Sequence, residues 1–223
     1  MTMLHGFGEQ LLLGAAGTLR LAAAALGIGC LLGFIGCALQ LSRRGLLRAS
    51  GHAYVAGIRG VPDLLVVFAV YFGGSWVLGV VSGGRMEVNA FFAGTIALGL
   101  SFGAYAAEIA RGGLASVPTG QREAARVLGL SRARALGCVV LPQAARAALA
   151  PLGNQTIVLL KQTSIVSIVG CDELMRKAAE AAGATREPFT MFLAAALIYL
   201  ALTGLLATGL AWADNRLAHP GTR

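Results

Sequence analysis

The side chains best suited to binding a polar solute lie in a stretch that is otherwise apolar, residues 147–170. They carry hydroxyl, amide and ammonium groups, which supply hydrogen-bond donors, acceptors and a positive charge. A stretch this polar does not suit a helix surrounded by lipid, so we expect it to face other helices or a water-filled path. Polar side chains of an earlier apolar stretch are predicted to line the same path. The predicted path residues are Tyr105, Glu108, Asn154, Lys161, Thr163 and Ser164.

Lys161 has no acidic residue close to it in the sequence. An ionisable residue inside a membrane is a functional candidate by default, so one interpretation is that Lys161 attracts a carboxylate of the solute. Two alternatives stay open: Lys161 pairs with Asp63 or Glu108 across a helix bundle, or its ammonium group extends to the membrane surface. Helix spacing predicts two closer ion pairs. They are Arg59 with Asp63 at i,i+4 and Glu108 with Arg111 at i,i+3.

The sequence does not indicate an active site or a nucleotide site. A Walker A motif needs Gly-Lys-Ser/Thr, but neither Lys161 nor Lys177 follows Gly or precedes Ser or Thr. No Ser/His/Asp set or carboxylate pair is suitably spaced. The four cysteines form no C-x-x-C pair, and the three histidines are far apart in sequence. We therefore expect no catalytic residue, no metal site and no cofactor bound by this chain.

The composition places the chain in a membrane. Hydrophobic residues make up 57% of its 223 residues and charged residues only 13%, whereas soluble domains average roughly 45–50% and about 25%. A net charge of +8 would suit nucleic acid in a soluble protein, but no basic run is interleaved with aromatic residues. Membrane orientation explains the charge better, and we expect no nucleic-acid partner.

Five apolar stretches are long enough to span a bilayer as helices. The expected spans are 21–41, 64–81, 88–107, 147–170 and 189–213. The predicted fold is therefore all-α and integral to the membrane, with residues 1–223 forming one domain.

Basic residues are concentrated in alternate connections between these spans. They follow the first and third spans and occupy the C-terminal tail, and are Arg43, Arg44, Arg48, Arg111, Arg122, Arg126, Arg132, Arg134, Arg146, Arg216 and Arg223. The opposite connections carry Arg85, Arg176, Lys177 and Arg186 together with five acidic residues. The positive-inside rule makes the first group cytoplasmic. The N-terminus is then periplasmic and the C-terminus cytoplasmic.

The connection 111–146 is about 35 residues long, which is too long for a passive link. A first short helix is expected to begin with Thr119 as a possible N-cap and to stop at Gly129. A second is expected to be capped by Ser131 and to continue to about Gly137. Two short cytoplasmic helices should therefore precede the fourth span.

The first short helix has a small apolar face formed by Ala124, Ala125 and Leu128. Its charged side chains are Arg122, Glu123 and Arg126. A helix this short is not stable by itself. Two interpretations fit: the helix docks into a groove on another protein, or it lies on the membrane with its arginines on anionic headgroups.

A longer pattern decides between them. The order is Glu123-Ala124-Ala125, three residues, Gly129, nine residues, Val139, one residue and Leu141-Pro142. It resembles the EAA loop of ABC importer permeases, with Val139 in place of the usual Ile. Flanking segments resemble the polar amino acid permease family over nearly the whole chain. They are 58–64, 101–113, 117–121, 153–154, 161–167 and 187–189, and residues 59–64 are most similar to permeases of histidine, lysine/arginine/ornithine and opine importers.

The resemblance implies a type I ABC importer transmembrane domain that moves polar, cationic amino acids or related opines across the bacterial inner membrane by alternating access. It implies two ATP-binding subunits, which use ATP and Mg, and a periplasmic substrate-binding protein. It also implies a second, related permease or a second copy of this chain, and the histidine-type likeness favours a heterodimer. The implied ATPase-coupling residues are Glu123, Ala124, Ala125, Gly129, Leu141 and Pro142.

Two other classes of function are alternatives. A passive, channel-like transport protein of this size would work without ATP and would not need the loop at 111–146. A small membrane enzyme would need a nucleophile, an acid and a base at one depth, and the sequence shows no such set. Co-purification of an ATP-binding subunit separates the importer from both.

Overall fold

The computed structural model describes residues 6–84 and 88–217. Within these residues it is helical without strands, and five helical segments are long and apolar enough to cross a membrane. They are Gly8–Gln40, Asp63–Ser82, Ala90–Ser116, Arg132–Val169 and Pro188–Asp214. The predicted all-α fold with five spans is confirmed. Arg85 and Arg223, which entered the orientation argument, lie outside the described residues.

The α-helices are α1 (Gly8–Gln40), α2 (Gly45–Arg59), α3 (Asp63–Phe68), α4 (Gly74–Ser82), α5 (Ala90–Ser116), α6 (Thr119–Val127), α7 (Arg132–Ala135), α8 (Leu141–Gln162), α9 (Leu174–Thr185) and α10 (Pro188–Leu217). Two π-helical segments, Ala69–Gly73 and Leu136–Val140, join α3 to α4 and α7 to α8. A 3₁₀ segment, Thr163–Val169, extends α8.

The first span is longer than the range 21–41 predicted for it. Helix α1 begins at Gly8 because its first part is also packed: Leu11 and Thr18 are fully buried. The fourth span differs more, since helix continues from Arg132 to Val169 where 147–170 was expected. The predicted second and fifth spans, 64–81 and 189–213, lie inside helical segments. The predicted third span, 88–107, begins two residues before its helix.

Two helices were not expected from the sequence. Helix α2 occupies what was predicted to be a loop after the first span; it is too short to span a bilayer by itself, and only Gly51 and Val55 are buried in it. The hydroxyl of Tyr54 donates to the carbonyl of Leu100 at 2.9 Å and attaches α2 to α5. Helix α9 begins after Glu173, whose side chain accepts hydrogen bonds from its first turn.

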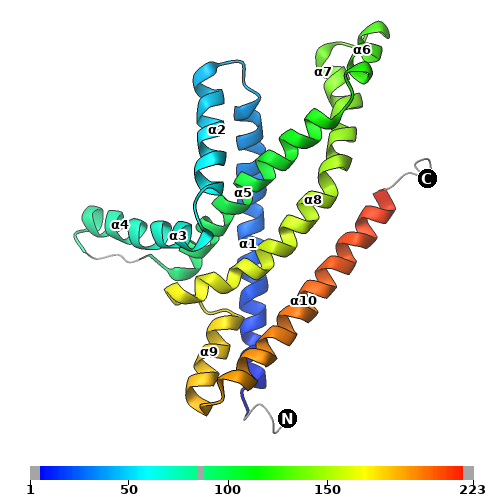
Figure 1. Cartoon of the computed structure of the whole chain (residues 1–223). Coiled ribbons are helices and arrows are strands. Elements are labelled where there is room, and N and C mark those ends of the chain that lie inside the picture. The colour runs from blue at the N-terminus through cyan, green and yellow to red at the C-terminus, as the bar shows by residue number, and fades with distance from the viewer. Residues whose placement is uncertain (1–5, 85–87, 218–223) are drawn as a thin grey trace.

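Helices α1 and α5 form the centre of the molecule and lie against each other over much of their length (Figure 1). Each presents two glycines four residues apart, Gly29 and Gly33 on α1 and Gly99 and Gly103 on α5. A Cβ atom at Gly33 would lie 2.7 Å from the Cβ of Ala106. These small residues let the two backbones approach closely, which is how helices associate inside a membrane.

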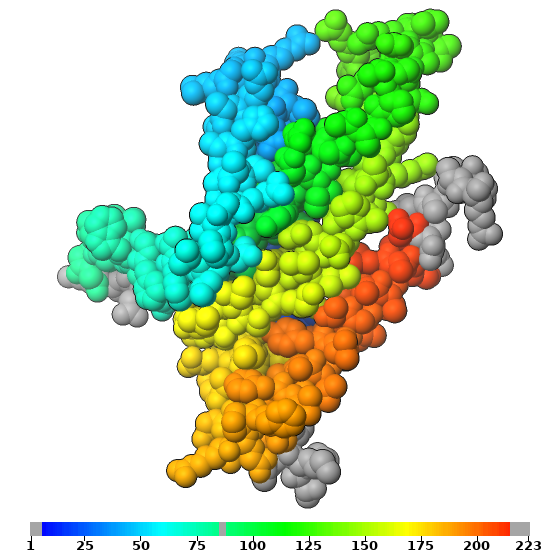
Figure 2. Space-filling model, in the orientation of Figure 1, coloured from blue at the N-terminus to red at the C-terminus, as the bar shows by residue number. Residues whose placement is uncertain are grey.

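The two ends of the molecule differ in what they carry. The turn between α1 and α2 and the α6–α7 pair lie at one end, and α9 and the start of α1 lie at the other (Figure 1). Helix α10 runs along α8, while α3 and α4 project from the bundle as an arm (Figure 2). The basic connections that the sequence assigned to one side, containing Arg43, Arg44, Arg132 and Arg134, are thus at the same end.

Gly33→Ala is expected to lower the stability of the folded protein by about 1–3 kcal/mol, because the added methyl group overpacks the α1–α5 contact. Thermal unfolding of the purified protein in detergent measures the change. Gly27→Ala is the matched control: it lies on the same helix with nothing within 4 Å of the new Cβ, so stability should stay constant or rise by up to about 1 kcal/mol. Equal unfolding midpoints for the two variants would contradict this account of the interface.

Candidate functional site

The α6–α7 segment begins differently from the prediction. Pro118, with φ −56° and ψ 141°, takes the N-cap position of α6, and no side chain caps the helix. Thr119 is therefore the first helical residue and not the N-cap that was predicted. Ser131 does cap α7, since its hydroxyl oxygen accepts a hydrogen bond from the backbone N–H of Arg134 at 3.4 Å.

Gly129 forms the turn between the two helices. Its φ is +76°, a conformation that only glycine adopts without strain. The N–H of Leu130 donates to the carbonyl of Ala125 at 3.0 Å, and the N–H of Gly129 to that of Arg126 at 2.9 Å. This pair of bonds is a Schellman motif, which satisfies the last carbonyls of a helix. The sequence placed a turn at Gly129, and the backbone has it.

The apolar face of α6 is not the one predicted. Ala125 is only 3% exposed and packs within the chain, whereas Val127 is 88% and Leu128 is 79% exposed. Glu123 and Ala124 are also exposed. The prediction that Ala124, Ala125 and Leu128 share an outward face is thus wrong for Ala125. The outward surface of α6, which we call the α6 surface, consists of Glu123, Ala124, Val127 and Leu128.

The α6–α7 pair is held to the spans on both sides. Val117, Val140 and Ala144 form a small buried cluster that Leu114 completes. The guanidinium of Arg122 donates to the carbonyl of Leu114 at 2.9 Å. These contacts fasten the pair to the end of α5 and to the start of α8.

Leu141 and Pro142 lie inside a continuous helix and do not begin a new one. The residues just before them form the π-helical segment Leu136–Val140. A proline ring clashes with the carbonyl four residues earlier, here that of Cys138, and provides no N–H; a π-turn is a common place for such an interruption. Both side chains are exposed, so the expected helix end near Gly137 is replaced by a bulge.

A second group of polar side chains comes from α5 and from the end of α2. The guanidinium of Arg59 lies over the ring of Tyr105, 5.0 Å from its centroid, which is a cation–π geometry. Glu108 and Arg111 form the predicted ion pair, with the Arg111 Nε at 3.1 Å from the carboxylate.

Asp63, predicted to pair with Arg59 or with Lys161, has another partner. Its carboxylate accepts a hydrogen bond of 2.6 Å from the side-chain amide of Gln162. Among the described residues, no ion pair joins Asp63 to either cation, and none joins Lys161 to Glu108. The pairing proposed for Arg59 and Asp63 is therefore wrong. Arg59 ends α2, and Asp63 begins α3 directly after Pro62, so the two residues do not lie on one helix.

Two of the predicted path residues line one cavity. A depression of about 490 Å³ between α8 and α10 is bordered by Lys161, Ser164, Ala196, Tyr199, Leu200 and Thr203. Lys161 is exposed there, and the hydroxyl of Ser164 donates to its carbonyl at 2.8 Å. We call this depression the α8–α10 cavity. It combines an ammonium group with three hydroxyl groups in an apolar wall.

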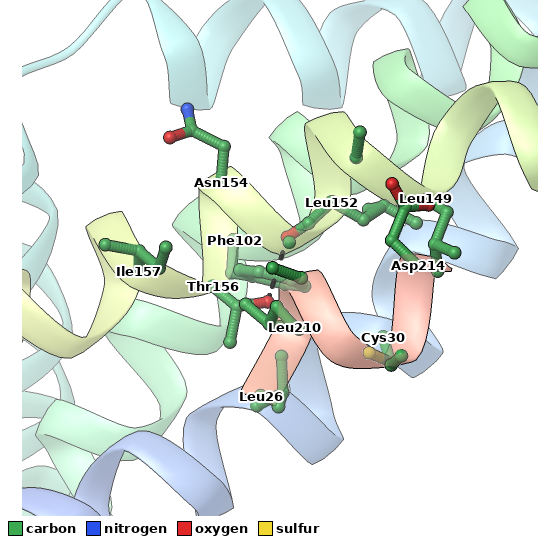
Figure 3. A pocket seen from close by; sticks show the side chains of 14 residues that line it. Leu26, Cys30, Phe102, Leu149, Leu152, Asn154, Thr156, Ile157, Leu210 and Asp214 are labelled. Carbon is green, nitrogen blue, oxygen red and sulfur yellow. Dashed lines mark hydrogen bonds between the residues drawn. The ribbon is translucent and has the colours of Figure 1, made fainter. Parts of the chain in front are cut away.

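The other predicted path residues lie elsewhere. Thr163 is fully buried, and its hydroxyl donates to the carbonyl of Leu160 at 2.8 Å. Tyr105 and Glu108 belong to the group beside Arg59 and Arg111. Asn154 borders a second cavity of about 480 Å³, yet its side chain points away from the others (Figure 3).

The second cavity, between α1, α5, α8 and α10, is apolar. Leu26, Phe102, Leu152 and Leu210 line it, and the hydroxyl of Thr156 donates to the carbonyl of Leu152 at 2.9 Å (Figure 3). Its polar side chains are Asn154, Thr156 and Asp214, and none of them supplies a positive charge for the carboxylate of a zwitterionic solute. The α8–α10 cavity is the better candidate for one.

Sequence reasoning missed Tyr199 and Thr203 in the cavity wall. They are four residues apart in the apolar run of the last span, which puts them on one face of a helix. Polar residues with helical spacing in an apolar run were therefore the available signal. The bond between Asp63 and Gln162 gave no such signal, because 99 positions separate the two residues.

Comparisons with known proteins agree on the kind of protein this chain resembles. Residues 25–219 match the family described as binding-protein-dependent transport system inner membrane component. The nopaline transport system permease protein NocQ of Agrobacterium fabrum is 39% identical over 98% of this chain and 94% of its own length. The arginine ABC transporter permease protein ArtQ of Haemophilus influenzae is 38% identical, covering 93% of each chain. The histidine/lysine/arginine/ornithine permease HisQ of Escherichia coli is 34% identical over 90% of each.

Solved structures give the same result. A crystal structure of an amino acid ABC transporter with histidines superposes with a TM-score of 0.85 at 34% identity, covering 93% of this chain and 94% of that one. The inward-facing methionine transporter MetNI superposes with a TM-score of 0.75 at 19% identity, covering 94% and 96%. At that identity the second match shows the fold alone.

Gly129→Ala is expected to destabilise the turn between α6 and α7 by about 1–2 kcal/mol, because a Cβ is disfavoured at positive φ. Hydrogen exchange should show it as an increase of roughly tenfold in the exchange rate of residues 128–131. Gly120→Ala is the control, because Gly120 also has open space around a Cβ but has no positive φ. Unchanged exchange in Gly129→Ala would refute the role of this glycine in the turn.

Proposed function

Because the chain belongs to the family of binding-protein-dependent transport system inner membrane components, we propose that it is the permease of an ATP-driven importer for polar, cationic amino acids or related opines. The observation that carries the proposal is the α6 surface, an exposed apolar and acidic patch on a short helix fastened to two spans. A span-linked helix of this kind suits docking into a groove of another protein.

The α6 surface is proposed to be the contact with an ATP-binding subunit. Val127 and Leu128 supply exposed apolar area, and Glu123 supplies a carboxylate for charge-assisted hydrogen bonds in the groove. Ala124 lets the partner backbone come close. The conformation of the α6–α7 segment is proposed to depend on Ala125, Gly129, Leu141 and Pro142. Two such subunits would use ATP and Mg, which this chain is not expected to bind.

The solute is proposed to pass the α8–α10 cavity. An amino acid carries a carboxylate, for which Lys161 and the hydroxyls of Ser164 and Thr203 offer donors. The relatives support the substrate class, since their names specify arginine, histidine, lysine, ornithine, nopaline and octopine. Tyr105, Glu108 and Asn154 stay proposed for other points of the path, and Thr163 for the support of the cavity wall.

We propose an assembly with a second permease and a periplasmic binding protein. The arm Asp63–Ser82 is apolar and little of it is buried, which leaves it free to lie against a related permease or a second copy of this chain. The end with the basic connections is proposed to be cytoplasmic. The binding protein would then meet the end that carries α9.

A passive channel is the alternative function, and ATP separates the two. Proteoliposomes with the purified assembly should take up labelled arginine only when ATP is present on the side of the α6 surface. A gradient-driven flux that is indifferent to ATP would favour the channel. Recovery of an ATP-binding subunit and a second permease with the tagged chain would support the importer, and recovery of neither from an intact complex would refute it.

The proposed orientation predicts which side of the membrane reaches Cys138, an exposed thiol between α7 and α8. A membrane-impermeant maleimide should label it in inside-out vesicles and leave it unlabelled in right-side-out vesicles. Glu180→Cys, at an exposed position of α9 and combined with Cys138→Ser, should show the reverse pattern. The Cys138→Ser variant gives the background, and labelling of Cys138 from the periplasmic side would overturn the topology.

Glu123→Arg is expected to abolish coupling, because it reverses the charge that is proposed to enter the ATPase groove. ATP-driven arginine uptake by the reconstituted assembly should fall at least tenfold, while the amount of folded permease in the membrane stays the same. Glu9→Arg makes the same change on an exposed residue at the opposite end of the molecule and should leave uptake near normal. Unaffected uptake in Glu123→Arg would rule out the coupling role.

A further inference from the structure

A fully buried carboxylate lies at the start of α9. Glu173 is 0% exposed, although glutamate is almost never fully buried unless it is paired. It accepts hydrogen bonds from the backbone N–H groups of Met175 at 2.9 Å and Arg176 at 2.7 Å, which makes it the N-cap of α9. Two hydroxyl groups from other helices also donate to it.

The first of these hydroxyl groups belongs to α1. Thr18 Oγ1 donates to Glu173 Oε2 at 3.4 Å and accepts from the backbone N–H of Leu174 at 3.2 Å. The neighbouring glycines of α1 allow this approach: a Cβ at Gly17 would lie 2.4 Å from the carbonyl oxygen of Asp172. The start of α9 is therefore fixed against α1 by both backbone and side-chain contacts.

The second hydroxyl group reaches the α8–α10 cavity. Tyr199 of α10 donates its phenolic O–H to Glu173 Oε2 at 2.7 Å, the length of a charge-assisted bond. The same tyrosine forms part of the cavity wall beside Lys161 and Ser164. The carboxylate that caps α9 thus also determines where the ring of Tyr199 lies.

The outward face of α9 carries charged side chains that are joined to each other. Lys177 forms ion pairs with Asp172 at 2.8 Å and with Glu180 at 3.2 Å, and Arg176 pairs with Glu180 at 2.9 Å. This face lies at the end where the binding protein is proposed to arrive. Glu173 caps the helix that carries this face and bonds to Tyr199 in the cavity wall.

We propose that Glu173 is a positioning residue that connects α9 to the α8–α10 cavity by holding Tyr199 in the cavity wall. The inference rests on the proposed function, because it treats that cavity as part of the solute path. A docked protein that displaces α9 would move the carboxylate of Glu173. The ring of Tyr199 would then either move with the carboxylate or lose its hydrogen bond to it. The wall of the cavity would therefore respond to what is bound outside.

The hydrogen bond between Glu173 and Tyr199 can be tested by conservative substitutions of either residue. Burial raises the pKa of Glu173, while the bonds from Met175, Tyr199, Arg176 and Thr18 act in the opposite direction. Glu173→Gln keeps the size of the side chain but replaces one acceptor oxygen with an NH₂ group, which faces donors and leaves them unpaired. Tyr199→Phe removes only the phenolic donor. Glu9→Gln, the same change on an exposed residue of α1, is the matched control.

The first measurement does not depend on the solute. Cys30 and Cys138, the two exposed cysteines, are replaced by Ser, and Ala196 in the cavity wall is replaced by Cys. In the complete assembly, Glu173→Gln and Tyr199→Phe should each change the rate of methanethiosulfonate labelling by about fivefold, and the double variant should change it no further, because both remove one interaction. Glu9→Gln should leave the rate unchanged.

The second measurement is the amount of labelled arginine imported per ATP hydrolysed in proteoliposomes. Glu173→Gln and Tyr199→Phe should each lower this ratio about fivefold, because the α6 surface still drives ATP hydrolysis while the cavity is misarranged. A purely structural role for Glu173 would lower uptake and ATP hydrolysis in parallel and leave the ratio constant.

The outcomes separate this inference from the proposed function. Additive effects of the two substitutions on labelling, or a constant import ratio, would overturn the positioning role. Failure of the wild-type assembly to import any basic amino acid would overturn the proposed function alone, and the labelling rates would still show whether Glu173 positions Tyr199.

Discussion

The fold depends on the close approach of α1 and α5. In lipid, burial of apolar surface does not drive helices together, so association relies on van der Waals packing and a few hydrogen bonds. Glycine pairs on both helices allow this packing. A Cβ at Gly99 would lie 2.8 Å from Ile28, and one at Gly29 would lie 2.6 Å from Phe102. Other helices join this pair by the same means. Gly113 meets the Ala144 carbonyl of α8, and Gly103 leaves room for Tyr54 of α2.

Two continuous segments connect this centre with both ends of the molecule. Helix α5 runs from the packed centre to Ser116, where the buried cluster around Val117 fastens the α6–α7 pair. Helix then continues from Arg132 to Val169, so that one helical segment begins directly after the α6–α7 turn and also carries Lys161 and Ser164. The π-turn before Pro142 and the proline at position 151 interrupt its hydrogen bonding. A long helix with two such interruptions has defined places to bend.

Much of this architecture could be predicted from the sequence, and the failures have physical causes. Hydropathy located the five spans because lipid requires long apolar helices. It could not detect α2, which is too short to span and is half apolar, nor the packed first part of α1. The turn at Gly129 was predictable because glycine is needed at positive φ. The inward side of Ala125 was not, because alanine is equally compatible with both faces, and only the tertiary contacts of α6 with α7 and with Leu136–Val140 determine which side is buried. Local spacing also cannot predict the hydrogen bonds of Asp63 with Gln162 and of Glu173 with Tyr199, because each joins residues that only the tertiary fold brings together.

The arrangement of charge shows why the α8–α10 cavity differs from the rest of the membrane-spanning region. Ionisable groups in lipid are stable when they are paired or in contact with water. Glu108 has Arg111, Asp63 has Gln162, and Glu173 has four donors, all supplied by this chain. Within the described residues, Lys161 forms no ion pair and lies exposed at the rim of a cavity. A lysine in such a place needs water, a partner protein or an anionic solute for its ammonium group. The carboxylate of an amino acid is a group of that kind, and the neighbouring hydroxyls of Ser164 and Thr203 can donate to it as well. Within the described residues, these three acidic side chains thus have partners from the chain itself, whereas Lys161 has no ion-pair partner.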